Sequence, residues 1–166
     1  MLAIALAALA GWAGAGAQTS LEYQVKASYL HNFIQFVDWP SGMLARAPRF
    51  NLCVVGLVRF GQALEPLAAE RVQGRPVAIV ALERPQEARA ARCHLLYVAR
   101  GAPAAGLAPA RGRLTVGETP GFLHAGGIIN LVEVRGRIRF EVNVAAADEA
   151  GLTLDARLLR LALNVP

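Results

Sequence analysis

The stretch that decides the fold is residues 50–57, which read F-N-L-C-V-V-G-L. The run is short and almost continuously apolar, and it includes a glycine near its end. Strands that are buried on both faces of a sheet have this character, whereas strands with one solvated face alternate between apolar and polar residues. Residues 50–57 therefore predict a central strand of a parallel sheet.

Further strands and helical segments alternate after this one. Three more apolar runs are expected to be strands: Pro76–Leu82, Cys93–Ala99 and Arg113–Val116. Between them, Phe60–Ala69 suits a helix and Arg84–Arg92 suits a short helix or turn. Strands that alternate with helices favour right-handed βαβ units, in which helices cover both faces of a parallel sheet.

The C-terminal part follows a different pattern. Ile128–Val134 and Arg137–Val144 are two apolar-rich runs that flank Arg135-Gly136, a plausible two-residue hairpin turn. Ala145–Gly151 is expected to be a short helical turn, and Asp155 can cap a final helix. The predicted fold is α/β, with a mostly parallel sheet flanked by helices (Rossmann-like) and a C-terminal antiparallel β-hairpin.

Residues Glu22–Asp38 predict an amphipathic helix. Val25, Tyr29, Phe33 and Phe36 follow a helical spacing, and Leu30, Ile34 and Val37 widen the apolar stripe. Pro40 disfavours helical backbone at the residue before it, so the helix is expected to stop near Trp39.

The first 17 residues have the pattern of an export signal. They carry no charged side chain, and Leu2–Ala10 is as long as a signal-peptide core but too short to cross a bilayer. Ala15-Gly16-Ala17 is a small-x-small cleavage site. A buried, alanine-rich helix is the alternative. The lysine or arginine that usually begins such a signal is missing, so the signal peptide is expected to be truncated at its N-terminus. We expect residues 1–17 to be this signal peptide and residues 18–166 to form one domain in the periplasm, without a membrane-spanning segment.

Composition limits the function classes. The chain has 166 residues, 55% of them hydrophobic, which is enough for a real core, and its formal net charge is +5. A basic chain can bind nucleic acid, but the arginines are scattered and no aromatic residues interleave with them. We therefore predict no nucleic-acid partner.

Two cysteines, Cys53 and Cys93, lie on predicted core strands. After export the compartment is oxidising, which favours a disulfide between them, while two separate buried thiols are the alternative. Neither lies in a CxxC motif, and no histidine spacing indicates a zinc site. No metal site is predicted.

Catalytic motifs are missing from the sequence. There is no G-x-S-x-G, and none of His31, His94 and His124 stands at a telling spacing from a carboxylate. Gly56–Gly61 reads G-x-x-x-x-G at the end of a strand, but Gln62 and Ala63 replace the lysine and the hydroxyl residue of a phosphate-binding loop. A structural turn is the favoured interpretation, so we predict no enzyme, no catalytic residue and no cofactor.

The predicted hairpin offers a candidate binding surface. Arg137, Arg139, Glu141 and Asn143 alternate with apolar residues, which places these four side chains on one face. That face is either merely solvated or a surface for a partner or ligand. The loop Gly117–Gly127 contains one large aromatic residue, Phe122, which either packs into the core or lines a cleft.

Several segments together resemble the YfiR-like family of periplasmic proteins. They are Val25-Lys26-Ala27-Ser28-Tyr29-Leu30 with Asn32-Phe33 and Phe36-Val37-Asp38-Trp39-Pro40, Leu52-Cys53-Val54-Val55-Gly56, Cys93-His94-Leu95-Leu96-Tyr97-Val98, Leu114-Thr115-Val116-Gly117 through Phe122, Gly126-Gly127-Ile128-Ile129, Arg139-Phe140-Glu141-Val142-Asn143, and Gly151-Leu152 through Arg157-Leu158-Leu159. The resemblance covers about Glu22 to Val165, and its specificity comes from seven motifs that occur in order.

The resemblance implies a regulatory function. Members of that family inhibit a membrane-bound diguanylate cyclase by binding its periplasmic sensor part, so it implies a periplasmic, non-catalytic brake on cyclic di-GMP synthesis. The implied partner is such a cyclase or another membrane signalling protein, with the oligomeric state left open and a homodimer among the alternatives. The resemblance also implies the Cys53–Cys93 disulfide, whereas a second cysteine pair found in some members is missing here.

The hairpin face, the loop Gly117–Gly127 and the family resemblance together indicate which residues bind a partner or a ligand. We predict partner binding by Phe122, Arg139, Glu141 and Asn143. The alternative function is a small-molecule sensor domain, in which Arg157 or the loop Gly117–Gly127 holds an anionic or aromatic ligand.

Overall fold

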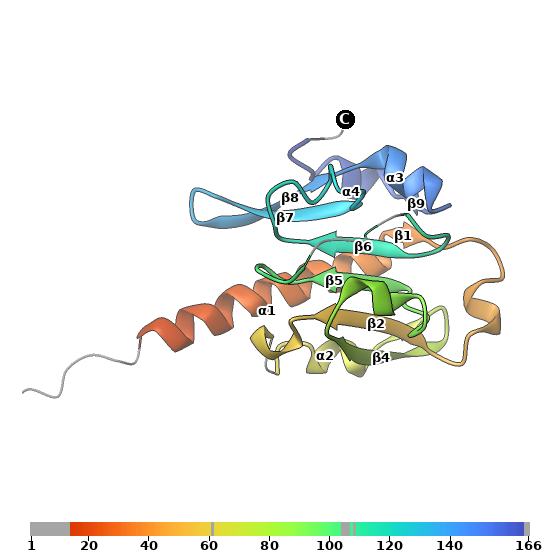
Figure 1. The fold of residues 1–166 in the computed structure, drawn as a ribbon, viewed down its shortest axis with the longest axis horizontal. Coiled ribbons are helices and arrows are strands. Elements are labelled where there is room, and N and C mark those ends of the chain that lie inside the picture. The colour runs from red at the N-terminus through yellow and green to blue at the C-terminus, as the bar shows by residue number, and fades with distance from the viewer. Residues whose placement is uncertain (1–13, 61, 104–106, 108, 165–166) are drawn as a thin grey trace, which may run out of the picture.

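The computed structural model describes residues 14–60, 62–103, 107 and 109–164. A curled seven-stranded sheet forms its centre (Figure 1). In spatial order the strands are β3 (Arg71–Val72), β4 (Arg75–Leu82), β2 (Phe50–Val55), β5 (Leu95–Val98), β6 (Leu114–Gly117), β7 (Ile129–Val134) and β8 (Arg137–Val142). The predicted strands are therefore present, and residues 50–55 lie inside the sheet.

The sheet is mixed rather than mostly parallel, which corrects the prediction. The inner pairs from β4 to β7 are parallel, but β3 pairs with β4 and β7 pairs with β8 in the antiparallel sense. The expected C-terminal hairpin is confirmed. Its turn residues Arg135 and Gly136 both have positive φ, 51° and 72°, as a type I′ turn requires.

The connections between the parallel strands are not the helices of a Rossmann-like fold. β2 is followed by the 3₁₀ turn η2 (Leu57–Arg59) and the short helix α2 (Glu65–Ala68), and β4 by the 3₁₀ turn η3 (Pro85–Ala88). Between β5 and β6 no helix occurs in the described residues. Proline occurs in each of these connections and glycine in two of them, and both residues disfavour the interior of a full crossover helix.

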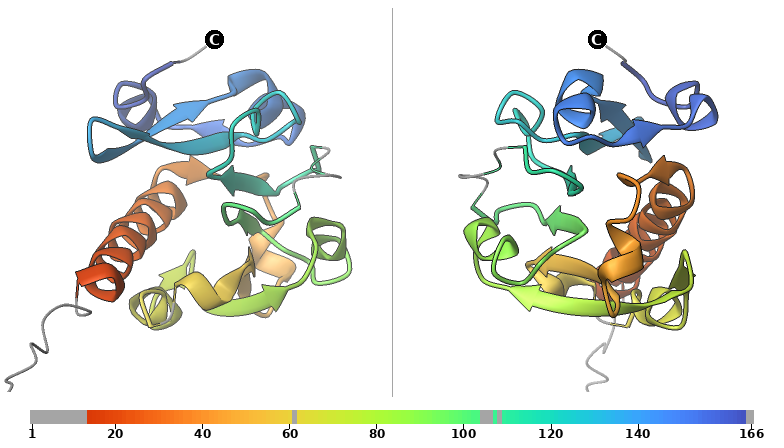
Figure 2. Two further views of the ribbon diagram at one scale, coloured as in Figure 1. Left: turned by 60° about the vertical axis from the view of Figure 1, so that its left-hand side comes forward. Right: turned by 90° about the vertical axis from the view of Figure 1, so that its right-hand side faces the viewer.

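Two apolar clusters form, one on each face of the sheet. The larger contains Leu52, Val54 and Tyr97 and lies beneath α1 (Gly14–Gln35), α3 (Val144–Glu149) and α4 (Ala156–Leu159). The smaller contains Val55 and Leu96 and is covered by η3 and by loops. Figure 2 shows α1 and η3 on opposite sides of the sheet.

The buried stripe of α1 differs from the predicted one. It consists of Tyr23, Lys26, Ala27, Leu30, Phe33 and Ile34, whereas Val25 is 38% exposed and Tyr29 and Phe36 are half-buried. When apolar residues cover a wide part of a helix, the sequence alone does not fix which of them face the core. The predicted face included Val25 and Tyr29, which lie at the edge of the buried face. Residues 14–17 of the predicted signal peptide form the start of α1, and residues 1–13 lie outside the described residues.

Short pairings connect distant parts of the chain. β1 (Val37–Asp38) follows α1 and pairs antiparallel with β9 (Thr153–Leu154), and the 3₁₀ turn η1 (Leu44–Arg46) leads into β2. At the outer edge of β8, Val142 N–H donates to Asn164 O and Phe140 O accepts from Leu163 N–H. Within the described part of the chain, no helix has the length and apolar character needed to cross a membrane.

The expected disulfide between Cys53 and Cys93 is present, with their Cα atoms 5.7 Å apart. Both cysteines are buried in the smaller apolar cluster. The bridge fastens β2 to the turn that precedes β5, and therefore fixes the amino end of that part of the sheet.

Candidate functional site

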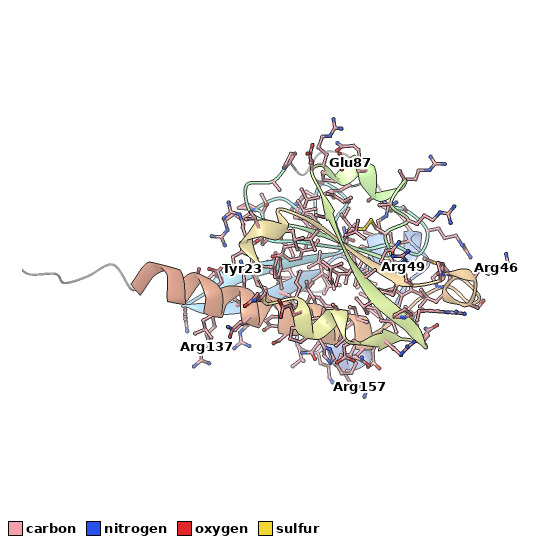
Figure 3. All side chains as sticks on the ribbon, turned by 90° about the horizontal axis from the view of Figure 1, so that it is seen from below. Tyr23, Arg46, Arg49, Glu87, Arg137 and Arg157 are labelled. Carbon is pink, nitrogen blue, oxygen red and sulfur yellow. A yellow bond between two sulfur atoms is a disulfide. The ribbon has the colours of Figure 1, made fainter. Side chains whose placement is uncertain are left out.

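The outer face of the hairpin is an exposed surface of arginine and valine. Arg137 lies opposite Val134, and Arg139 lies opposite Val132, and residues that pair across two strands share a face. Both arginines are exposed, Val134 is 38% exposed, and Figure 3 shows Arg137 pointing away from the body of the protein. The ion pairs among the described residues include neither arginine.

Glu141 continues this surface toward the body of the sheet. It pairs in register with Asn130 and is half-buried, so it lies on the same face as Arg139. The structure therefore brings Arg139 and Glu141 together, as the alternation predicted.

The Asn143 side chain forms hydrogen bonds within the chain. It is the N-cap of α3, where its Oδ1 accepts a hydrogen bond from Ala146 N–H at 3.0 Å. Its Nδ2 donates to Leu123 O at 3.3 Å. Both ends of the amide are engaged within the chain, so the side chain fastens the loop Gly117–Gly127 to the start of α3.

Phe122 lies in the core and does not line a cleft. Its exposed fraction is 1%, and its ring is enclosed by two glycines. A Cβ atom added at Gly117 would lie 2.4 Å from the ring, and one added at Gly127 would lie 2.2 Å from it. Of the two alternatives for this residue, packing into the core is the one observed, and an exposed apolar anchor would require the loop to open.

Arg157 is on α4, away from the hairpin's outer face. Its Nη2 lies 2.7 Å from Asp155 Oδ2, and its guanidinium stacks over the Phe36 ring at 4.9 Å. The hydrogen bonds from the Arg157 side chain and backbone hold the pKa of Asp155 at about 2. The cation is therefore already neutralised by a neighbour, which weakens the case for Arg157 as a ligand-binding residue.

A buried polar cluster was missed by the sequence analysis. Lys26 is 1% exposed and forms ion pairs with Glu22 and Glu118, and the Glu118 side chain is equally buried. Tyr97 Oη donates to Glu118 Oε1 at 2.9 Å, and Tyr23 Oη donates to it at 3.2 Å. The position of Lys26 could have indicated this cluster. It lies three residues after Tyr23 and four before Leu30, on the side of α1 that is otherwise apolar.

The charges in this cluster stabilise one another. Burial opposes ionisation of Glu118, but hydrogen bonds from Lys26, from Arg100 N–H and from Tyr97 outweigh it and lower its pKa. Burial likewise opposes the charge on Lys26, whereas its hydrogen bonds to Glu118 and Glu22 raise its pKa. Burial raises the pKa of Tyr97, which stays a neutral hydrogen-bond donor. The cluster is an ion pair that fixes α1 to the carboxyl ends of β5 and β6.

Beside the buried Lys26–Glu118 ion pair, an open groove of about 440 Å³ lies between α1 and the hairpin. Leu21, Val25 and Ile138 line it, together with Arg139 from the edge strand. Leu21 is 60% exposed. The groove places exposed apolar side chains next to the arginines of the hairpin, which enlarges the candidate surface.

A larger groove of about 990 Å³ lies on the other side of α1, next to the segment that follows β2. Its lining includes His31 from α1, with Arg59 and Phe60 from the β2–α2 connection and Glu70 at its rim. His31 Nδ1 is 3.9 Å from Glu70 Oε1. The groove is at the carboxyl end of β2, where the strand order reverses between β2 and β5, and ligands of open α/β sheets commonly bind at such a point.

Comparisons with known proteins agree with the resemblance seen in the sequence. The model of a family described as YfiR/HmsC-like matches residues 23–163. The structure is similar to the crystal structure of a conserved domain protein from Vibrio cholerae O1 biovar El Tor, with a TM-score of 0.53 and 12% identity, over 87% of this chain and 60% of that one. At that identity the likeness concerns the fold alone.

Another similar structure is an ABC domain from Streptococcus pneumoniae in complex with L-Trp, with 12% identity over 71% of this chain and 55% of that one. Its TM-score of 0.47 is too low to indicate a shared fold. This chain thus spans little more than half the length of both solved chains. No curated protein matches the sequence.

Proposed function

The chain belongs to the YfiR/HmsC-like family, and from this premise we propose that it is a periplasmic negative regulator of cyclic di-GMP synthesis. It binds the periplasmic sensor part of a membrane-bound diguanylate cyclase and restrains that enzyme. In this proposal residues 1–17 direct export, residues 18–166 form the mature domain, and the protein acts by binding and not by catalysis.

One observation supports binding through the hairpin. Arg137 and Arg139 are exposed beside Val132 and Val134, and no ion pair within the described chain involves either arginine. Guanidinium groups form strong paired hydrogen bonds with carboxylates, and arginines next to apolar side chains are frequent hot spots of interfaces. A sensor domain with carboxylates around an apolar patch would fit this face.

The Cys53–Cys93 disulfide supports the location. Disulfides form and persist in oxidising compartments such as the periplasm and are rare in the cytosol. A buried bridge that holds the sheet together is therefore in keeping with a protein that works after export.

The test is to measure affinity for the periplasmic part of the cyclase that co-purifies with the protein from membranes. We expect Arg139→Ala and Glu141→Ala to unfold at the same temperature as the parent but to bind it roughly 30-fold more weakly, about 2 kcal/mol, because a charge on the partner is left unpaired. Arg160→Ala, an exposed arginine on another element, is the matched control and should bind normally. Parental affinity in both hairpin variants would make the face a solvated edge.

A second candidate function is small-molecule sensing, which the groove between α1 and the β2–α2 connection favours. The groove has room for a small ligand and contains charged and aromatic side chains, Arg59 and Phe60 among them. Native mass spectrometry of protein released from the periplasm under mild conditions would detect a ligand that co-purifies. An Arg59→Ala variant that keeps the same bound mass would rule out this groove as the site.

A further inference from the structure

A cleft of about 450 Å³ lies near the disulfide, at the amino ends of β2 and β5. Three arginines line it: Arg46 from η1, Arg49 just before β2, and Arg92 from the turn before β5. Figure 3 shows Arg46 and Arg49 on the same side of the molecule. The cleft shares no lining residue with either groove along α1.

No carboxylate balances these three charges. The lining of the cleft contains no aspartate or glutamate, and none of the three arginines has a hydrogen bond or ion pair from its side chain to another described residue. Every aspartate and glutamate of the sequence is among the described residues, so an acidic side chain has not been overlooked. Like charges that gather without a counter-charge repel one another, and a bound anion would relieve that repulsion.

His94 adds a fixed hydrogen-bond donor to the wall of the cleft. It is 5% exposed, and its Nδ1 accepts a hydrogen bond from Asn51 N–H at 2.9 Å. Burial lowers the pKa of His94, so the ring is neutral at pH 7 and carries its proton on Nε2. Stacking on Phe50, with ring centroids 5.1 Å apart, holds the ring in place. Nε2–H has no partner among the described residues.

The backbone at Arg92 suits a glycine, which provides a clean test of the side chain. Its φ is 51°, and it ends the turn that follows η3, where Cys93 N–H donates to Ala88 O at 3.0 Å. Glycine would fit here without strain, so Arg92→Gly removes the side chain and leaves the backbone undisturbed.

The neighbouring Asn51 indicates what kind of anion fits. Its Nδ2 donates to Ala91 O at 2.9 Å and to Arg92 O at 3.3 Å, which fixes the orientation of the amide. Its Oδ1 is buried and has no partner among the described residues. An unpaired acceptor beside a cationic site calls for an anion that carries a hydroxyl group of its own.

We propose that this cleft binds a phosphate group, with Arg46, Arg49 and Arg92 neutralising its charge, His94 Nε2–H donating to one oxygen, and the protonated phosphate oxygen donating to Asn51 Oδ1. Hydrogen phosphate has both the charge and the hydroxyl, whereas sulfate at neutral pH has the charge alone. The site therefore prefers phosphate to sulfate. The ligand is therefore inorganic phosphate, because the phosphodiester of a phospholipid carries no phosphate hydroxyl and a phosphate monoester is largely deprotonated at neutral pH.

The test is isothermal titration of the full exported chain with inorganic phosphate, with sulfate, and with vesicles containing phosphatidylglycerol, all at matched ionic strength. Arg92→Gly removes the side chain and suits the backbone, so it should fold at least as well as the parent. We expect this variant to bind phosphate at least tenfold more weakly, as the loss of charge-assisted hydrogen bonds implies. Arg135→Gly replaces the other arginine of the same φ, 51°, outside the cleft, and should bind normally.

Each outcome bears on the proposal. Phosphate binding that is tighter than sulfate binding and weakened only by Arg92→Gly supports a site for soluble phosphate. Binding of vesicles but not of inorganic phosphate would contradict the proposal, because the phosphodiester of the headgroup has no hydroxyl to donate to Asn51 Oδ1. If neither binds, or if Arg92→Gly and Arg135→Gly act alike, the proposal is wrong. Arg139→Ala should leave phosphate binding unchanged, which separates this test from that of the hairpin.

Discussion

Glu118 carries a buried charge that is held by four partners within the chain. Its carboxylate accepts hydrogen bonds from Tyr23, Tyr97 and Arg100 N–H and forms an ion pair with Lys26 in the interior. Glu118→Gln would leave the buried lysine without its counter-charge, so we expect it to lower the free energy of unfolding at pH 7 by about 3–5 kcal/mol, measured by urea denaturation.

The same variant has a distinctive pH dependence. The pKa of Glu118 is lower in the folded protein than its ordinary value of 4.5, so its contribution to stability is fully present above pH 4.5 and is lost as the pH falls through the folded pKa. The stability difference between the parent and Glu118→Gln should therefore shrink on acidification below that value. Glu149→Gln, which changes an exposed carboxylate, should show no such convergence, and a constant difference for Glu118→Gln would refute the assignment.

The sequence predicted the positions of some residues correctly and not those of others. The disulfide partners followed from the compartment and from the resemblance, because the chain has only two cysteines. Phe122 could not be placed, because its burial depends on two glycines, Gly117 and Gly127, meeting around its ring. Lys26 was passed over because an apolar stripe was assigned by its hydrophobic residues alone.

At the scale of elements, the hairpin turn makes a further prediction. Arg135 occupies a position with φ of 51° in a type I′ turn, where asparagine is favoured and left-handed backbone disfavours most other side chains. Arg135→Asn should therefore raise the free energy of unfolding by about 0.5–1 kcal/mol in urea denaturation. Arg137→Asn, in the extended strand next to it, is the control and should bring no gain. Equal effects would show that the turn conformation is not what limits stability.

Strands could be predicted better than the segments that join them. An apolar run such as residues 50–55 identifies a buried strand directly, and Arg135-Gly136 identifies its turn. Whether a connection becomes a helix depends instead on the distance that it must span and on what covers it. For that reason Phe60–Ala69, expected to be one helix, forms only the short helix α2 and turns.

For the whole molecule, the disulfide is the principal covalent constraint. Cys53 and Cys93 are separated by 40 residues, and a bridge over such a loop stabilises a protein by roughly 4 kcal/mol, mainly by restricting the unfolded chain. We expect the double variant Cys53→Ala, Cys93→Ala to lose about that much in urea denaturation. Adding a reductant should destabilise the parent and leave the double variant unchanged. A parent that is insensitive to reduction, even when unfolded, would show that the bridge does not form.

The architecture as a whole was only partly predictable. The α/β class and the antiparallel C-terminal hairpin followed from local patterns, because each depends on neighbouring residues. The antiparallel partner of β4 did not, because β3 is only two residues long, Arg71–Val72. The binding surfaces depend on assembly: the cleft near His94 joins residues 43–51 to residues 80–94, and no short motif indicates that meeting.

The pairing of β1 with β9 has a consequence for how the protein is made. Val37 and Asp38, among the first residues of the fold, find their partners only at Leu154 and Thr153. A ribosome releases the chain from its N-terminus, so β1 has no pairing partner until almost the whole chain has emerged. Native folding can therefore be completed only after residues 153–154 have left the ribosome and, in the proposed function, the export channel.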